Sequence, residues 1–209
     1  MEKLEPLWLR VLGWLAELIG DQSRKRAMVD AGATPEQAEA VRLVSVPLGT
    51  GYSVEGERSM DAEKLRRLGE SLAQKWPPKA EKDGTLVTFC NFSVQEAAQA
   101  YGCHDLDGMM ANDMALALAD GLIPSWRRAL GDRAALHAQR GGLALAAKTY
   151  PGHGHVAVLA PEPMKFSGSW GYDVPCVYNV GKKNGLMKCS EAFAVAEGEP
   201  AYYIYGETA

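Results

Sequence analysis

The chain lacks several features that would point to common functional classes. It has no excess of positive charge, because 22 Lys and Arg residues face 26 Asp and Glu residues and the net charge is −4. Nucleic acid and anionic membranes are therefore poor partners on electrostatic grounds. It contains neither a GxSxG nucleophile elbow nor a GxxxxGK[ST] phosphate loop. Its four cysteines form no CxxC pair, which argues against a zinc ribbon.

A signal peptide and a membrane span are also missing from the pattern. The apolar start, MEKLEPLWLRVLGWLAELIGD, is interrupted by Arg10 and Glu17 and does not end in a small-residue cleavage site. Its apolar residues instead follow helical spacing, which predicts an amphipathic helix: Leu4, Leu7, Val11, Leu12, Leu15 and Leu18. We expect a protein made in the cytoplasm, with no membrane insertion.

The remaining sequence predicts two regions. Residues 1–80 have helical patterns, ending with MDAEKLRRLGESLAQKW, and form a helical N-terminal region of unknown role. The segment WPPKAEKDGT, with two prolines and four charges, marks a boundary. A second domain, 81–209, then follows, and the hydrophobic content of 47% is ample for a sizeable core.

The second domain changes from helices to strands along its length. A strand-like TLVTF precedes three predicted helices: CNFSVQEAAQAYG, MMANDMALALADG and a segment around SWRRALGDRAALHAQRGG. Four predicted strands follow: GLALAAK, HVAVLA, VPCVYNVG and AYYIYG. Helices followed by antiparallel-looking strands indicate an α+β fold.

One set of residues in this domain could carry nucleophilic chemistry. Cys90 lies at the predicted start of a helix, where free N–H groups and the helix dipole favour a thiolate. His155 opens the strand HVAVLA beside Gly154 and could act as base, then acid. Asn179, on the next strand, could accept from the second ring nitrogen and fix the tautomer. The ordinary alternative for Cys90 is a buried thiol that packs as a small hydrophobe.

These segments resemble a known family. TFCNFSVQEAAQAYG, then GHGHVAVL, then a polar residue on the next strand are similar to the papain-like cell-wall hydrolases of the CHAP (cysteine, histidine-dependent amidohydrolase/peptidase) and NlpC-like type, over about residues 81–209. Cys90 and His155 match the family's nucleophile and base. Asn179 matches the third residue by order and type only, and Asp173 and Asn184 remain alternatives.

The resemblance implies a papain-like catalytic domain, with helices packed on an antiparallel sheet. It implies hydrolysis of peptide or amide bonds of bacterial peptidoglycan through a thioester acyl-enzyme, as in endolysins, without a metal or cofactor. The backbone N–H of Cys90 would then form part of the oxyanion hole. Without a signal peptide, such an enzyme would act at the cell wall after lysis or dedicated secretion, and an inhibitor or immunity protein is a conceivable partner.

The pair His153 and His155 in GHGH has a second interpretation as half of a zinc site. In an extended segment both side chains point the same way, and a third ligand such as Asp173 or His137 would complete a metal-dependent hydrolase. Otherwise His153 is a turn residue or a substrate contact, and His104 and His137 are expected to face solvent.

Four residues are candidates for substrate binding: Asn91, Asn112, His153 and Trp170. Asn91 could assist the oxyanion site or cap the helix of Cys90. Asn112 could line the cleft, although its apolar helix favours a structural role. Trp170 could wall a groove or cover the core. Cys103, Cys176 and Cys189 are open to disulfide pairing. A non-catalytic module of the same fold, binding cell-wall fragments or a protein partner, is the remaining alternative to an enzyme.

Overall fold

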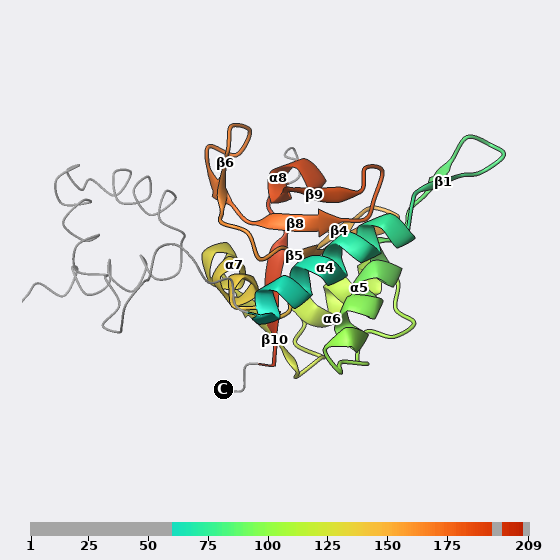
Figure 1. Ribbon diagram of the computed structural model, residues 1–209. Coiled ribbons are helices and arrows are strands. Elements are labelled where there is room, and N and C mark those ends of the chain that lie inside the picture. Colours follow the sequence, from blue (N-terminus) through green and yellow to red (C-terminus); the bar gives the residue numbers. More distant parts are fainter. Residues whose placement is uncertain (1–59, 194–197, 207–209) are drawn as a thin grey trace, which may run out of the picture. The chain divides into compact units, whose positions relative to one another are not determined.

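The computed structural model describes residues 60–193 and 198–206, which belong to one compact unit running from Arg58 to Ala209. Its helices are α4 (Met60–Lys75), α5 (Cys90–Ala100), α6 (Ala111–Ala119), α7 (Gly131–Gln139) and α8 (Cys189–Ala192). Its strands are β1 (Lys79–Ala80), β2 (Leu86–Val87), β3 (Trp126–Ala129), β4 (Ala144–Tyr150), β5 (His153–Leu159), β6 (Lys165–Ser167), β7 (Tyr172–Val174), β8 (Cys176–Asn179), β9 (Gly185–Lys188) and β10 (Ala201–Tyr205). The α+β prediction is confirmed (Figure 1).

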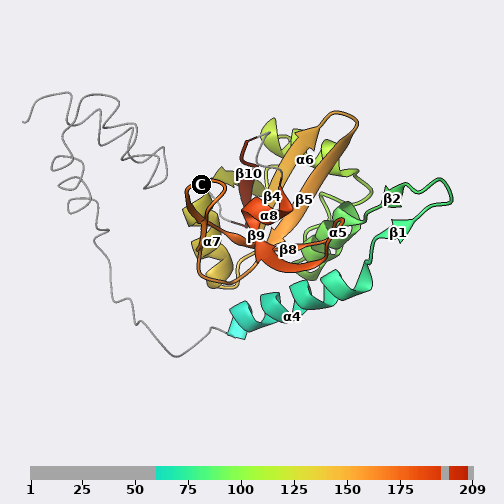
Figure 2. The same cartoon turned by 90° about the horizontal axis from the view of Figure 1, so that it is seen from above.

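A six-stranded sheet organises the unit. Its strand order is β3-β10-β4-β5-β8-β9, and every neighbouring pair is antiparallel. The pairs β1-β2 and β6-β7 form two separate hairpins, and the first projects away from the rest of the unit in both views (Figures 1 and 2). No helix among residues 60–193 and 198–206 is long and apolar enough to cross a lipid bilayer.

The central strands are covered on both faces. Ala144–Ala147 of β4, Val156–Leu159 of β5 and all of β8 are buried without alternation. Successive residues of a strand point to opposite faces, so unbroken burial means that helices or loops pack on each side. The middle of the sheet is therefore buried between two layers, and its strands β5 and β8 carry two of the predicted site residues, His155 and Asn179.

Helix α4 was predicted from its sequence and is present, but it belongs to the compact unit. It contacts α5, α7, β8 and β9, so this unit begins at Arg58 rather than at residue 81. The other helices predicted for residues 1–80 lie outside the described residues. Where α4 meets β8, Gly69 lies against the ring of Tyr178 so closely that a Cβ atom would be 2.0 Å from the ring carbon Cδ2.

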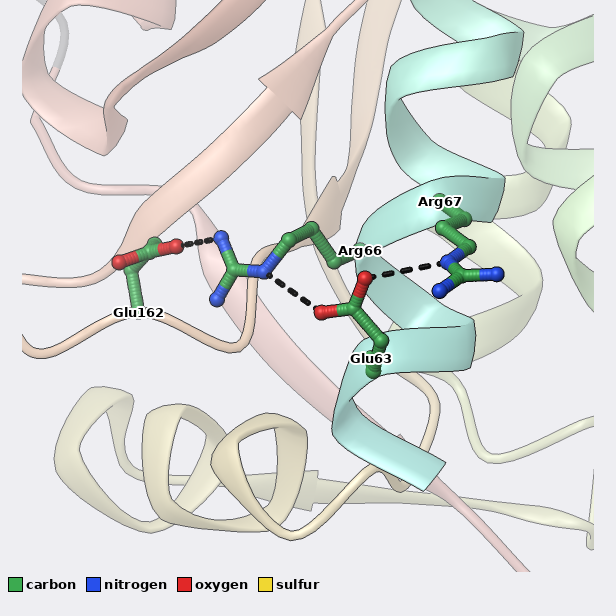
Figure 3. Close-up of polar contacts among 4 residues, drawn as sticks. All are labelled: Glu63, Arg66, Arg67 and Glu162. Atoms are coloured by element: carbon green, nitrogen blue, oxygen red, sulfur yellow. Dashed lines mark hydrogen bonds and ion pairs between the residues drawn. The ribbon is translucent and has the colours of Figure 1, made fainter. Parts of the chain in front are cut away.

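Charged side chains fasten the N-terminal half of α4. The Arg66 guanidinium bonds to the carboxylate of Glu162, in the loop between β5 and β6 (Figure 3). Its Nε atom also lies 3.5 Å from Glu63, which is 3.1 Å from Arg67. Arg66 and Glu162 are largely buried, at 13% and 15% side-chain exposure, so removing one partner would leave the other charge poorly solvated.

Two predicted elements differ from the structure. Trp126–Ala129, expected within a helix, forms edge strand β3 because Trp126 packs into the core and the strand pairs with β10. Helix α7 begins only at Gly131. The predicted strand 85–89 is reduced to Leu86–Val87, which pairs with the charged segment that was interpreted as a boundary.

Candidate active site

Cys90 is the first residue of α5, as predicted, and its side chain is buried at 5% exposure. Phe89 occupies the cap position and makes no side-chain cap bond. Asn91 does not cap the helix either, because its amide nitrogen reaches the carbonyl of Met109 at 3.4 Å. The capping interpretation of Asn91 was therefore wrong. The backbone N–H groups of Cys90 and Asn91 at this helix start interact with the thiol.

His155 and Asn179 come together because two adjacent strands carry them. The β5–β8 register pairs Val158 with Tyr178, and continuing it sets Ala157 opposite Asn179. His155, two residues earlier in β5, is then a diagonal neighbour of Asn179 on the same face. The ring atom Nε2 of His155 lies 2.7 Å from Oδ1 of Asn179.

The neighbours of Asn179 determine the tautomer of His155. Nδ2 of Asn179 donates to the carbonyl oxygen of Lys183 at 2.5 Å, and a carbonyl can only accept. The amide NH₂ group must therefore face Lys183, so the oxygen faces the ring. It follows that Nε2 of the neutral imidazole carries the proton and Nδ1 is the basic nitrogen.

Two further residues enclose the imidazole, and the sequence analysis did not identify either. Phe193, which is buried, lies with its ring 4.8 Å from that of His155, tilted by 53°. Gly181 leaves the remaining space, because a Cβ atom there would be 3.4 Å from Cε1 of His155 and 3.1 Å from Nδ2 of Asn179. The turn signal VGKKNG could have placed Gly181 beside Asn179, whereas no local pattern singles out Phe193.

Burial shifts both reacting groups toward their neutral forms. It raises the pKa of the Cys90 thiol, opposed by the backbone N–H groups of Val156, Asn91 and Cys90 itself. It lowers the pKa of His155, opposed by the hydrogen bond that the ring donates to Asn179, while His153 lowers it further. The thiolate expected at this helix start is therefore not favoured, because desolvation outweighs the effect of the backbone N–H groups on the thiol pKa.

The thiol nevertheless lies beside the residue that follows His155 in β5. The N–H group of Val156 interacts with the Cys90 sulfur, and Val156 directly follows His155. Within residues 60–193 and 198–206, no hydrogen bond joins this sulfur to the imidazole. The structure thus places the Cys90 sulfur beside the backbone of β5 at Val156, and the adjacent His155 beside Asn179, and burial favours the neutral thiol and the neutral imidazole.

The predicted substrate-binding residues on the β4–β5 side have structural neighbours. His153 is exposed and stacks on Tyr150, with 5.1 Å between ring centroids. Asn112 donates to the carbonyl of Tyr150 at 3.3 Å. The start of α6 packs so tightly on Gly154 that a Cβ atom there would lie 2.5 Å from the backbone nitrogen of Asn112. Gly154 thus allows the start of α6 to approach β5 closely.

The other candidates lie on different elements. Trp170 belongs to the β6–β7 hairpin, which is separated from α5 in Figure 1, and packs against the core beside Tyr172. Asp173 is exposed on β7. Asn184 lies near Asn179, but its side chain bonds to backbone groups. Of the three candidates for third member, only Asn179 bonds to His155.

The metal alternative gains no support from the ligand set. Among the described residues, no three His, Cys, Asp or Glu side chains are grouped closely enough to hold an ion. His104 is exposed, as expected, and lies 3.0 Å from Asp107. His137 was expected to face solvent, but it is half-buried against Gly142. Cys90, Cys103, Cys176 and Cys189 are all buried and free, so no disulfide forms.

Comparison with known proteins assigns no family: no protein-family model matches the chain, and no curated protein matches it significantly.

Proposed function

We propose that the protein is a cysteine amidohydrolase or endopeptidase with a papain-like catalytic domain, cleaving peptide or amide bonds of bacterial peptidoglycan. The observation that carries the proposal is the 2.7 Å bond from His155 to Asn179, on strands that also bring the neighbouring Val156 N–H to the Cys90 sulfur. The cell-wall substrate follows from the sequence resemblance.

Catalysis begins with a neutral pair. Nδ1 of His155 removes the thiol proton as the sulfur of Cys90 attacks the substrate carbonyl, so a separate thiolate is not required beforehand. Negative charge then develops on the carbonyl oxygen, and the backbone N–H of Cys90 at the start of α5 can stabilise it. Asn179 holds the ring and stabilises the imidazolium through Nε2.

Collapse of the tetrahedral intermediate breaks the carbon–nitrogen bond. The imidazolium gives its proton to the leaving amine, and an acyl thioester remains on Cys90. His155 then removes a proton from water, whose oxygen attacks the thioester. The sulfur leaves and recovers the proton, so atoms and charge balance over the cycle.

The test is turnover of purified peptidoglycan, with released fragments identified by mass spectrometry. The wild type should release fragments, whereas Cys90→Ala and His155→Ala should not. Cys176→Ala is the matched control, because Cys176 is also buried but starts β8 instead of α5. Undiminished release by Cys90→Ala would refute the mechanism.

In the described part of the chain no hydrogen bond joins the thiol to the imidazole, and burial raises the thiol pKa; both observations favour a second candidate function. It is a non-catalytic module of the same fold that binds cell-wall fragments or a partner protein. Sedimentation with purified peptidoglycan, without fragment release by the wild type, would support this candidate and exclude the enzyme.

A further inference from the structure

Asn184 connects two parts of the chain that are more than one hundred residues apart. Its Nδ2 group donates to the carbonyl oxygens of Ala73 at 2.9 Å and Trp76 at 2.8 Å. These carbonyls lie in and just after the last turn of α4, where helix carbonyls lack intrahelical partners. Its Oδ1 atom accepts from the N–H of Gly181 at 3.0 Å. Asn184 is thus both a helix-end partner and a brace inside its own turn.

The same turn also fixes the orientation of the Asn179 side chain. Gly181 and Lys183 belong to the segment between β8 and β9, and the carbonyl of Lys183 is the acceptor that orients the Asn179 amide. A continuous series of bonds therefore runs from the end of α4 through Asn184, the turn and Asn179 to the imidazole of His155. Figures 1 and 2 both show this end of α4 beside α5, the helix that begins with Cys90.

We infer that Asn184 is a positioning residue: it fixes the turn after β8 to the C-terminal end of α4, and so holds Asn179 in the orientation that keeps the proton on Nε2 of His155. The inference rests on the proposed function for its catalytic consequence, but the orientation of the ring can be measured independently. It also gives α4 a role in the site, although α4 precedes the domain that the sequence predicted.

No other side chain of similar size provides this set of bonds. The bridge needs an amide donor that serves two carbonyls and an acceptor for one N–H group, on a short side chain. Asp keeps the acceptor but loses both donors, and it sets a negative charge at the negative end of the α4 dipole. Ala loses all three bonds. Both substitutions should release the turn, and Ala should do so without adding charge.

The experiment compares Asn184→Ala, Asn184→Asp and Asn179→Ala in the full chain. NMR of ¹⁵N-labelled histidine reports the tautomer and pKa of each imidazole, and His155→Gln assigns the resonance among four histidines. Release of fragments from peptidoglycan gives kcat/KM. Arg66→Met is the control, because it removes the ion pair at the other half of α4 without contacting the turn.

Three results are expected from these variants. Asn184→Ala should move the His155 tautomer signal in the same direction as Asn179→Ala, and lower kcat/KM by about 10- to 100-fold, as small misplacements of catalytic groups do. Asn184→Asp should also lower kcat/KM. Arg66→Met should reduce Tm while leaving the His155 signal unchanged.

Two results would overturn the inference, and they differ in what they say of the enzyme. If Asn179→Ala moves the His155 signal but neither Asn184 variant does, Asn184 has no positioning role and the proposed function stands. If Asn179→Ala leaves both signal and rate unchanged, the pathway through Asn179 is refuted together with its proposed catalytic role.

Discussion

The two halves of the candidate site are held in different ways. The thiol half consists of Cys90 at the start of α5, fixed by helix packing and touched by backbone N–H groups. The imidazole half consists of His155 and Asn179, fixed by a series of side-chain hydrogen bonds that extends to α4. Packing buries the thiol away from water, whereas the hydrogen bonds of Asn179 determine which nitrogen of the His155 ring is basic. In the proposed mechanism, the imidazole half would therefore control the reactivity of the site.

The comparison predicts the largest effect for loss of the base. His155→Gln should lower kcat/KM by about 10²- to 10⁴-fold, the usual contribution of a positioned general base. It should also slow alkylation of Cys90, because the thiol pKa is already raised by burial and no other base is bonded nearby among the described residues. Mass spectrometry of iodoacetamide-treated protein would measure Cys90, with buried Cys176 as the internal reference. Equal alkylation rates in wild type and variant would mean that the two halves do not act together.

A smaller loss is predicted for the orienting residue. Asn179→Ala removes one hydrogen bond to the imidazole, worth about 1–3 kcal/mol, or roughly 5- to 150-fold in kcat/KM. Because this bond raises the pKa of His155, its loss should shift that pKa further down and move the acidic limb of the pH–rate profile to lower pH.

Asn179→Asp is the informative counterpart. A carboxylate beside the ring should raise the pKa of His155, moving the acidic limb in the opposite direction. Shifts of the same sign in both variants would contradict the assigned bond.

These residues also show where sequence reasoning succeeds. Cys90 begins α5 as the sequence predicted, and the adjacent apolar strands placed Asn179 near His155, although β5 begins at His153 instead of at His155. The bridge from Asn184 to Trp76 was not predictable, because the prolines after Trp76 resemble a domain boundary and no local pattern reports a contact across 108 residues. Likewise, Trp126–Ala129 has two arginines and no alternation, so only pairing with β10 makes it a strand.

A third prediction tests how α4 packs on β8, independently of the hydrogen bonds between Asn184 and the end of α4. Gly69→Ala should destabilise the protein by about 1–3 kcal/mol, since a Cβ atom would overlap the buried ring of Tyr178. This cost exceeds the gain of about 1 kcal/mol in helix propensity. Glu70→Ala, at an exposed position of the same helix, is the control. Urea unfolding gives the free energies, and an unchanged midpoint for Gly69→Ala would show that α4 is not packed on β8 as described.

The smallest predicted effect is on the pH dependence of stability, and it again distinguishes the two halves. Burial depresses the pKa of His155 in the folded protein below its unfolded value of about 6.5, so the unfolded chain binds more protons near that pH. The contribution of His155 is therefore fully present above about pH 6.5 and is lost as the pH falls toward the folded pKa. Urea unfolding of wild type and His155→Gln between pH 5 and 8 should show the wild type losing more stability on acidification. If both proteins follow the same pH dependence, the imidazole is not held in the desolvated, neutral form that the proposed mechanism uses, and the thiol would need another base.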